Sequence, residues 1–131
     1  MASHFVRQPV PNRRALIVDD DPVSRKLLRA MLDQQGWAVS DFPAAGIALD
    51  SITSHGAELI LFEIGMQSMT GLELCRVIRS QGGASQPKIV AYTAHAQQED
   101  KKLFMSNGFD DILLKPVNSK TVAAMLERLG Q

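Results

Sequence analysis

The sequence has one cysteine, no excess of either charge and no long apolar run. Cys75 alone excludes an intramolecular disulfide and argues against a cysteine-based zinc site. The 14 basic and 14 acidic side chains leave no net positive charge of the kind that nucleic-acid and anionic-membrane binders use. No apolar run approaches the ~20 residues of a membrane-spanning helix, and the N-terminus lacks the apolar core of a secretory signal. These absences predict a soluble, cytoplasmic protein without direct nucleic-acid binding or membrane insertion.

A length of 131 residues suits one domain with a single core. Pro9 and Pro11 favour extended backbone near the N-terminus, and two arginines follow them. We therefore expect residues 1–14 to form a flexible tail or linker and residues 15–131 to form the domain.

Short apolar runs of strand length alternate with segments of helical periodicity. The expected strands cover residues 15–18, 37–42, 58–62, 88–92 and 112–114. The expected helices open at Pro22, at Pro43, near Leu72, at Gln97 and after Asn118. A helix between consecutive strands returns the chain to the same end of the sheet, so this alternation predicts an α/β fold with a parallel sheet.

The first expected helix has clear start and stop signals. Asp21 can cap the free N–H groups at its N-terminus, Pro22 suits its first turn, and Gly36 can end it in a left-handed conformation. Its expected buried stripe runs through Val23, Leu27 and Met31, widened by Leu28 and Leu32. The second helix is expected to carry Ile47, Leu49 and Ile52 on its apolar stripe.

Polar residues follow four of the expected strands. They are Asp19, Asp20 and Asp21 after the first, Glu63 after the third, Thr93 after the fourth and Lys115 after the fifth. The carboxyl ends of parallel strands meet at the edge where ligands bind in such sheets. Magnesium binds through oxygen ligands and commonly uses one or two carboxylates, and a lysine beside it can neutralise phosphoryl oxygens. Each residue alone has an ordinary structural explanation, such as helix capping for Asp21; the coincidence of four strand ends predicts a phosphoryl-handling site.

Motifs at these strand ends resemble the receiver domain of two-component response regulators. The motifs are Leu16–Pro22, Leu59–Met66 with Met69 and Gly71–Leu74, Tyr92–Ala94, and Leu114–Pro116. The resemblance covers about residues 14–129. It implies a flavodoxin-like (βα)5 fold, doubly wound, with strand order 2-1-3-4-5.

The resemblance also implies roles for the site residues. Asp19 and Asp20 would bind Mg²⁺, together with the acid of the third strand and the backbone carbonyl of Gly65. The position of Glu63 would be the phosphoacceptor. Thr93 would hydrogen-bond the phosphoryl group, and Lys115 would pair with it.

This sequence departs from the receiver pattern at the acceptor, where the family has aspartate and this chain has Glu63. Its extra methylene displaces the carboxylate, and misplacement near 1 Å can slow a reaction about a hundredfold. We therefore expect Glu63 to accept a phosphoryl group poorly or not at all. Two consequences stay open: Glu63 mimics phosphoaspartate and favours the active state, or it locks the domain in the inactive state as a docking module. The sequence leaves open whether the glutamate is natural or engineered.

Other departures concern the switch. Ile112 stands where the family often has an aromatic residue whose ring moves on phosphorylation, so the usual coupling to Thr93 is in doubt. His95 occupies a position that in the family modulates access of water to the phosphoryl group, although an exposed loop histidine explains it equally well. Gln67 and Thr70 replace a proline and an aspartate of the loop after the third strand.

The resemblance implies protein partners rather than an enzymatic activity. These are a histidine kinase, a histidine phosphotransfer protein or other domains of a hybrid kinase. A homodimer through the face formed by residues 97–106, 112–114 and 118–129 is a further possibility. The competing hypothesis is a small magnesium-dependent phosphatase of the haloacid-dehalogenase type, using Asp19 and Asp21. A dinucleotide or flavin carrier is disfavoured because no glycine-rich loop follows the first strand.

Overall fold

The computed structural model describes residues 13–64, 71–81, 86–94 and 98–131. In these residues five strands alternate with five helices along the chain. The elements are β1 (Arg14–Val18), α1 (Pro22–Gln34), β2 (Ala38–Phe42), α2 (Ala45–His55), β3 (Leu59–Glu63), α3 (Gly71–Ser80), β4 (Lys88–Thr93), α4 (Gln98–Ser106), β5 (Asp111–Leu114) and α5 (Ser119–Arg128). All strand pairs are parallel, and the sheet order is β2-β1-β3-β4-β5. The predicted flavodoxin-like fold class is therefore confirmed.

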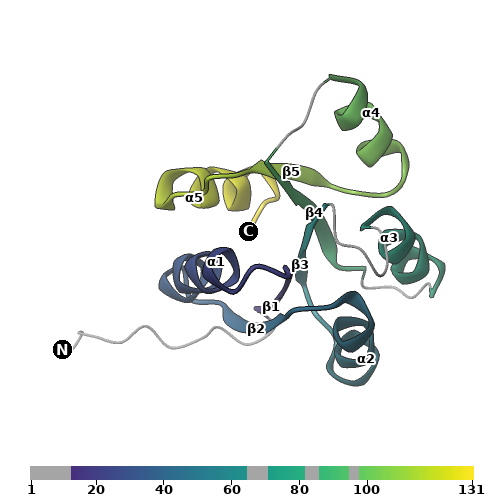
Figure 1. The fold of residues 1–131 in the computed structure, drawn as a ribbon, viewed down its shortest axis with the longest axis horizontal. Helices are drawn as coiled ribbons and strands as arrows, with labels where there is room; N and C mark the ends of the chain where they lie inside the picture. Colours follow the sequence, from purple (N-terminus) through teal and green to yellow (C-terminus); the bar gives the residue numbers. More distant parts are fainter. Residues whose placement is uncertain (1–12, 65–70, 82–85, 95–97) are drawn as a thin grey trace.

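The sheet lies between two layers of helices (Figure 1). Helices α1 and α5 cover one face, and α2, α3 and α4 cover the other. The reversal of strand order beside β1 places its carboxyl end, with that of β3, at the position where ligands bind in doubly wound sheets.

The central strands are buried on both faces, as their continuous apolar sequence requires. Ile17, Leu61 and Val90 pack in the core beneath α1 and α5, whereas their neighbours Val18 and Phe62 pack toward the other helices. These five side chains are fully buried, and each contributes roughly 1.5–3 kcal/mol through removal of its surface from water. This double core holds the strand ends in a fixed relation to one another.

Helix α1 begins and ends at the predicted residues. The Asp21 side chain accepts a hydrogen bond from the Val23 backbone N–H, and Pro22 occupies the first turn. After the helix, Gly36 has a φ of 88°, a conformation that glycine adopts at little cost. The last helix, α5, likewise begins at the predicted cap, Asn118, which accepts a hydrogen bond from the Thr121 N–H.

Two apolar stripes are narrower than predicted. Val23 and Leu27 are 74% and 46% exposed, while Leu28 and Leu32, one step around α1, are fully buried against the sheet. In α2 the small residue Ala48 is buried and Ile47 is 53% exposed. The interpretation of Val23, Leu27 and Ile47 as buried was wrong, because each helix contacts the sheet through a face narrower than its apolar sequence.

The remaining differences are small. β1 begins at Arg14, one residue earlier than predicted, and β3 extends to Glu63, which is therefore its last residue. Trp37 lies just before β2 and is buried in the core. Residues 1–12 lie outside the described part, so the N-terminal tail remains a prediction. Among the described helices, none is both long and apolar enough to cross a bilayer.

Candidate phosphoryl and metal site

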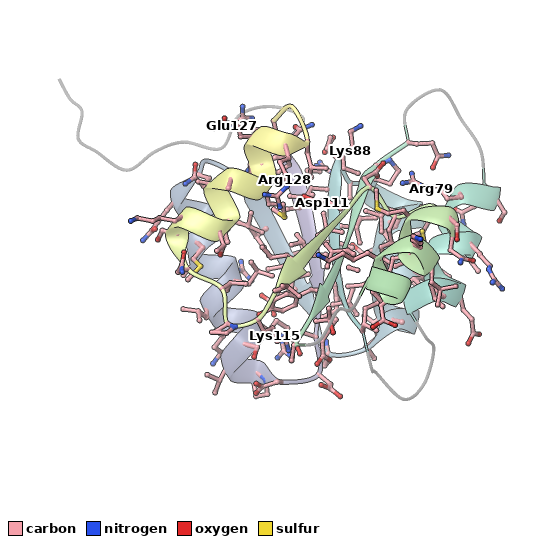
Figure 2. All side chains as sticks on the ribbon, turned by 90° about the horizontal axis from the view of Figure 1, so that it is seen from above. Arg79, Lys88, Asp111, Lys115, Glu127 and Arg128 are labelled. Carbon is pink, nitrogen blue, oxygen red and sulfur yellow. The ribbon has the colours of Figure 1, made fainter. Side chains whose placement is uncertain are left out.

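The carboxyl ends of the parallel strands bring the predicted polar residues to one edge of the sheet. Asp19 directly follows β1, Glu63 and Thr93 end β3 and β4, and Lys115 directly follows β5. Figure 2 shows Lys115 at the end of the sheet opposite Lys88, the residue with which β4 begins. The edge predicted from the sequence is thus the edge at which these residues gather.

Three carboxylates converge at this edge. Asp19, Asp20 and Glu63 each offer an oxygen, and these oxygens lie within 4.8 Å of one another. Asp19 is fully buried, Asp20 is exposed, and the Glu63 side chain is 18% exposed. An oxygen-only set with one solvent-facing member suits Mg²⁺, which keeps several waters when it binds to protein.

Lys115 supplies the positive charge of the site. Its Nζ lies 3.1 Å from Glu63 Oε1 and 3.5 Å from Asp19 Oδ2. On another side Nζ lies 4.7 Å from the centroid of the Tyr92 ring, a cation–π distance. We call Asp19, Asp20, Glu63 and Lys115 the acidic cluster; its three carboxylates and one ammonium leave a formal charge of −2.

The pKa values of the acidic cluster reflect this imbalance. Burial raises the pKa of Glu63, and repulsion from Asp19 and Asp20 adds to the increase despite the hydrogen bond from Lys115. Burial alone would lower the pKa of Lys115, but the hydrogen bond to Glu63 and the attraction of Asp19 outweigh it and raise that pKa. Lys115 therefore stays charged, whereas ionisation of Glu63 is less favourable here than in water.

Asp19 is anchored by its backbone and by one carboxylate oxygen. Its N–H donates to the Phe42 carbonyl at 3.1 Å, its carbonyl accepts from Arg25 Nη1 at 2.8 Å, and its Oδ1 accepts from the Asp21 N–H at 2.9 Å. The other oxygen, Oδ2, is buried and has no hydrogen-bond partner within the described residues. A buried charged oxygen without such a partner is costly, so this atom fits a site that receives a cation.

A second group of charges, which the sequence analysis missed, lies next to the first. Asp41, near the end of β2, accepts hydrogen bonds from Arg25 Nε and Arg29 Nη1. Burial would raise the pKa of Asp41, but the hydrogen bonds from Arg29 and Arg25 outweigh it and lower that pKa. We call Arg25, Arg29 and Asp41 the arginine cluster. The available signal was a carboxylate near the end of the second predicted strand, in line with those of the first and third.

Thr93 and Ile112 lie on β4 and β5 as predicted. Thr93 is buried at the end of β4, and Ile112 is half-buried and packs against the core on the α2, α3 and α4 side. Their roles in a phosphorylation switch stay predictions. Gly65 and His95 lie outside the described residues. Tyr92, which contacts Lys115 and is the register partner of Glu63, was named in a motif of the sequence but was given no role at the site.

Comparisons with known proteins define the family. Residues 15–127 match the response regulator receiver domain family, and the chain belongs to it. An uncharacterized 14.6 kDa protein of Leptolyngbya boryana is 34% identical over 113 residues, which cover 86% of each chain. The sensor protein GacS of Pseudomonas syringae pv. syringae is 29% identical over 116 residues, covering 86% of this chain and only 13% of GacS.

Solved structures agree with this assignment. The chemotaxis protein CheY4 of Vibrio cholerae superposes with a TM-score of 0.81 at 26% identity, covering 88% of this chain and 96% of CheY4. This protein is thus a receiver domain of two-component signalling, a class of modules that typically lack enzymatic activity and interact with histidine kinases or phosphotransfer proteins. Receiver domains typically bind Mg²⁺ at acidic residues, and this chain has such a cluster. The comparisons give the phosphatase hypothesis for Asp19 and Asp21 no support.

Proposed function

We propose that this chain is an atypical receiver domain in which Glu63 replaces the phosphoacceptor aspartate and accepts a phosphoryl group poorly or not at all. Asp19, Asp20 and Glu63, with the Gly65 carbonyl, would hold Mg²⁺, which when bound neutralises charge on phosphoryl oxygens. The residues that precede β1 would act as a linker to this domain. The domain would work as a conformational or docking module in a two-component or phosphorelay system.

The observation that carries the proposal is the contact between Glu63 and Lys115. Glu63 ends β3, and its longer side chain places Oε1 3.1 Å from Lys115 Nζ. Lys115 therefore already has an anionic oxygen beside it without any phosphoryl group. In-line attack on a phosphoryl donor requires close placement of the acceptor oxygen, and a paired, displaced carboxylate meets that requirement poorly.

Phosphorylation by acetyl phosphate tests the proposal directly. With Mg²⁺ and acetyl phosphate, the intact mass of the wild-type chain should stay unchanged, whereas Glu63→Asp should gain one phosphoryl group. The aspartate variant is the matched control because it changes only the length of the acceptor side chain. A stoichiometric phosphoryl gain in the wild-type chain would refute the proposal.

The same variant separates the two states that Glu63 could favour. Beryllofluoride should bind the Glu63→Asp variant and shift its backbone amide NMR spectrum toward the active conformation. If Glu63 mimics phosphoaspartate, the wild-type spectrum should resemble that of the beryllofluoride-bound variant. If Glu63 locks the inactive state, the wild-type spectrum should resemble the free variant.

Docking through the face of α4, β5 and α5 forms part of the proposal. Met105 and Leu114 are 50% and 44% exposed there, and the Arg128–Asp111 ion pair lies on the same face. Apolar side chains surrounded by charges suit a homodimer or a partner protein. Light scattering coupled to size-exclusion chromatography should show a dimer that Leu114→Asp weakens. If the chain is a monomer at all concentrations, the homodimer is excluded and this face is proposed to bind a partner protein.

A further inference from the structure

The Arg25 guanidinium joins α1 to the ends of β1 and β2. Its Nη1 donates to the Asp19 backbone carbonyl at 2.8 Å, and its Nε donates to Asp41 Oδ1 at 2.9 Å. The Arg25 side chain is only 15% exposed. The planar guanidinium can hold two acceptors in a fixed relation, which a lysine ammonium on a flexible stem does poorly. Arg25 therefore fixes the junction between β1 and α1.

This junction controls the direction of one metal-site oxygen. The Asp19 N–H is bound to Phe42 and its Oδ1 to the Asp21 N–H, so the Arg25 bond to its carbonyl completes the set of anchors. With these groups held, Oδ2 is left directed to the acidic cluster, 3.5 Å from Lys115 Nζ. Loss of the hydrogen bond to the Asp19 carbonyl would allow the peptide group between Asp19 and Asp20 to rotate. The position of Asp20 would change with it.

Arg29 provides an internal comparison. It donates to the other oxygen of Asp41 and lies 3.9 Å from Asp33, one turn further along α1. Among the described residues, Arg25 donates to the Asp19 carbonyl, whereas Arg29 contacts Asp41 and Asp33. Both arginines thus share Asp41, and they differ in their contact with Asp19.

We propose that Arg25 is a positioning residue that presents Asp19 to the bound cation, and that Asp41 in turn orients Arg25. This inference rests on the proposed Mg²⁺ site. Groups that orient metal ligands from outside the coordination shell commonly change metal affinity by about 10- to 100-fold when they are mutated. Arg25 acts in this way from the backbone side of its ligand.

Titration of the full chain with Mg²⁺ tests the inference in matched variants. Arg25→Met should weaken Mg²⁺ binding about tenfold in calorimetry, whereas Arg29→Met should keep the wild-type affinity within about twofold. Arg25→Lys should have a Mg²⁺ affinity between those of the two methionine variants, since the lysine retains the charge and can reach one acceptor at a time. Urea unfolding establishes that all variants are folded during the titration. Equal weakening by the two methionine variants, or no weakening by Arg25→Met, would overturn the inference.

A second measurement needs no metal. In Mg²⁺-free buffer, Arg25→Met should accelerate amide hydrogen exchange at Asp19 and Asp21, while Arg29→Met should not. If the wild-type chain binds no Mg²⁺ and this exchange pattern holds, the cation part of the proposed function fails and the positioning of Asp19 stands. If Mg²⁺ binds and the exchange rates of the two variants are alike, the positioning role fails and the cation site stands.

Discussion

The arginine cluster and the acidic cluster meet at the end of β1 with opposite balances of charge. The arginine cluster has two cations for one carboxylate, and each oxygen of Asp41 accepts a hydrogen bond. The acidic cluster has three carboxylates for one ammonium, and Asp19 Oδ2 has no hydrogen-bond partner among the described residues. The first cluster thus pairs its carboxylate fully within the chain, whereas the second keeps an excess of negative charge.

The pKa values show the same contrast. The pKa of Asp41 is lowered because the two arginine hydrogen bonds outweigh its burial. The pKa of Glu63 is raised because burial and the neighbouring acids outweigh Lys115. Ionisation of Asp41 therefore stabilises the fold, whereas ionisation of Glu63 is opposed by it. Carboxylates of the same chemistry are thus stabilised in the ionised form in one cluster and destabilised in the ionised form in the other.

Removal of Lys115 should lower the stability of the protein more than any other change in the two clusters. Lys115→Met leaves Asp19, Glu63 and Asp20 without their ammonium, and breaking a buried ion pair typically costs about 3–5 kcal/mol. Because Lys115 and Glu63 are 19% and 18% exposed, we expect a smaller loss, about 2 kcal/mol in the free energy of unfolding at pH 7. Urea unfolding measures it.

Magnesium should restore part of that loss, because binding to the folded state alone stabilises it. The control is Lys120→Met, which changes an exposed lysine of α5 and should have little effect. A loss in Lys115→Met no larger than in this control would show that the acidic cluster does not depend on its ammonium.

Replacement of Asp41 by asparagine should destabilise the protein by about 1 kcal/mol at pH 7, since the neutral amide keeps only one acceptor oxygen and makes no charge-assisted hydrogen bond with either arginine. The folded-state pKa of Asp41 is lowered, so its stabilisation is complete above the unfolded value of about 3.9 and is lost as the pH falls through the folded value. The difference between the wild-type chain and Asp41→Asn should therefore shrink below about pH 4. Urea unfolding across this pH range checks it, with the exposed Asp50→Asn as control. A difference that grows on acidification would contradict the assigned sign.

The sequence was sufficient for the fold class and for most of the acidic cluster. Parallel strands place their carboxyl ends together, so Asp19, Glu63 and Lys115 could be predicted to meet without knowledge of any contact. Periodicity was less reliable for helix faces. It marks residues that can be buried, and the width of the contact with the sheet decides that Leu28 is buried and Val23 is not.

The arginine cluster could not be predicted from local patterns. Arg25 and Asp41 are separated by 16 positions, and their contact depends on how α1 lies beside the end of β2. The ring of Tyr92 beneath Lys115 likewise depends on the register between β3 and β4. Both contacts join elements through tertiary packing, which the spacing of residues along the chain does not encode.

Neutralisation of Glu63 should stabilise the protein, whereas neutralisation of Asp41 should destabilise it. Glu63→Gln removes repulsion with Asp19 and the cost of a partly buried charge, and its amide oxygen can still accept from Lys115. We expect a gain of about 0.5–1 kcal/mol at pH 7 without metal, together with a smaller stabilisation by Mg²⁺. Unfolding with and without Mg²⁺ measures both, with the exposed Glu127→Gln as control. If Glu63→Gln without metal lowers the free energy of unfolding as much as Asp41→Asn does, the two clusters do not differ in the way described.

Replacement of Asp33, which lies at the exposed edge of the arginine cluster, should change the free energy of unfolding least. Its Oδ2 lies 3.9 Å from Arg29 Nε, and the two side chains are 53% and 45% exposed. Exposed pairs four residues apart contribute about 0.3–0.5 kcal/mol, and less when the basic residue precedes the acidic one, as here. Asp33 also lies in the last turn of α1, where a negative charge is unfavourable to the helix dipole. Because these two effects oppose each other, Asp33→Asn should change the free energy of unfolding by at most about 0.3 kcal/mol, and added salt should reduce even that. A loss close to that of Asp41→Asn would mean that the cluster extends along α1 to its exposed end, and that Arg29 is oriented from both sides.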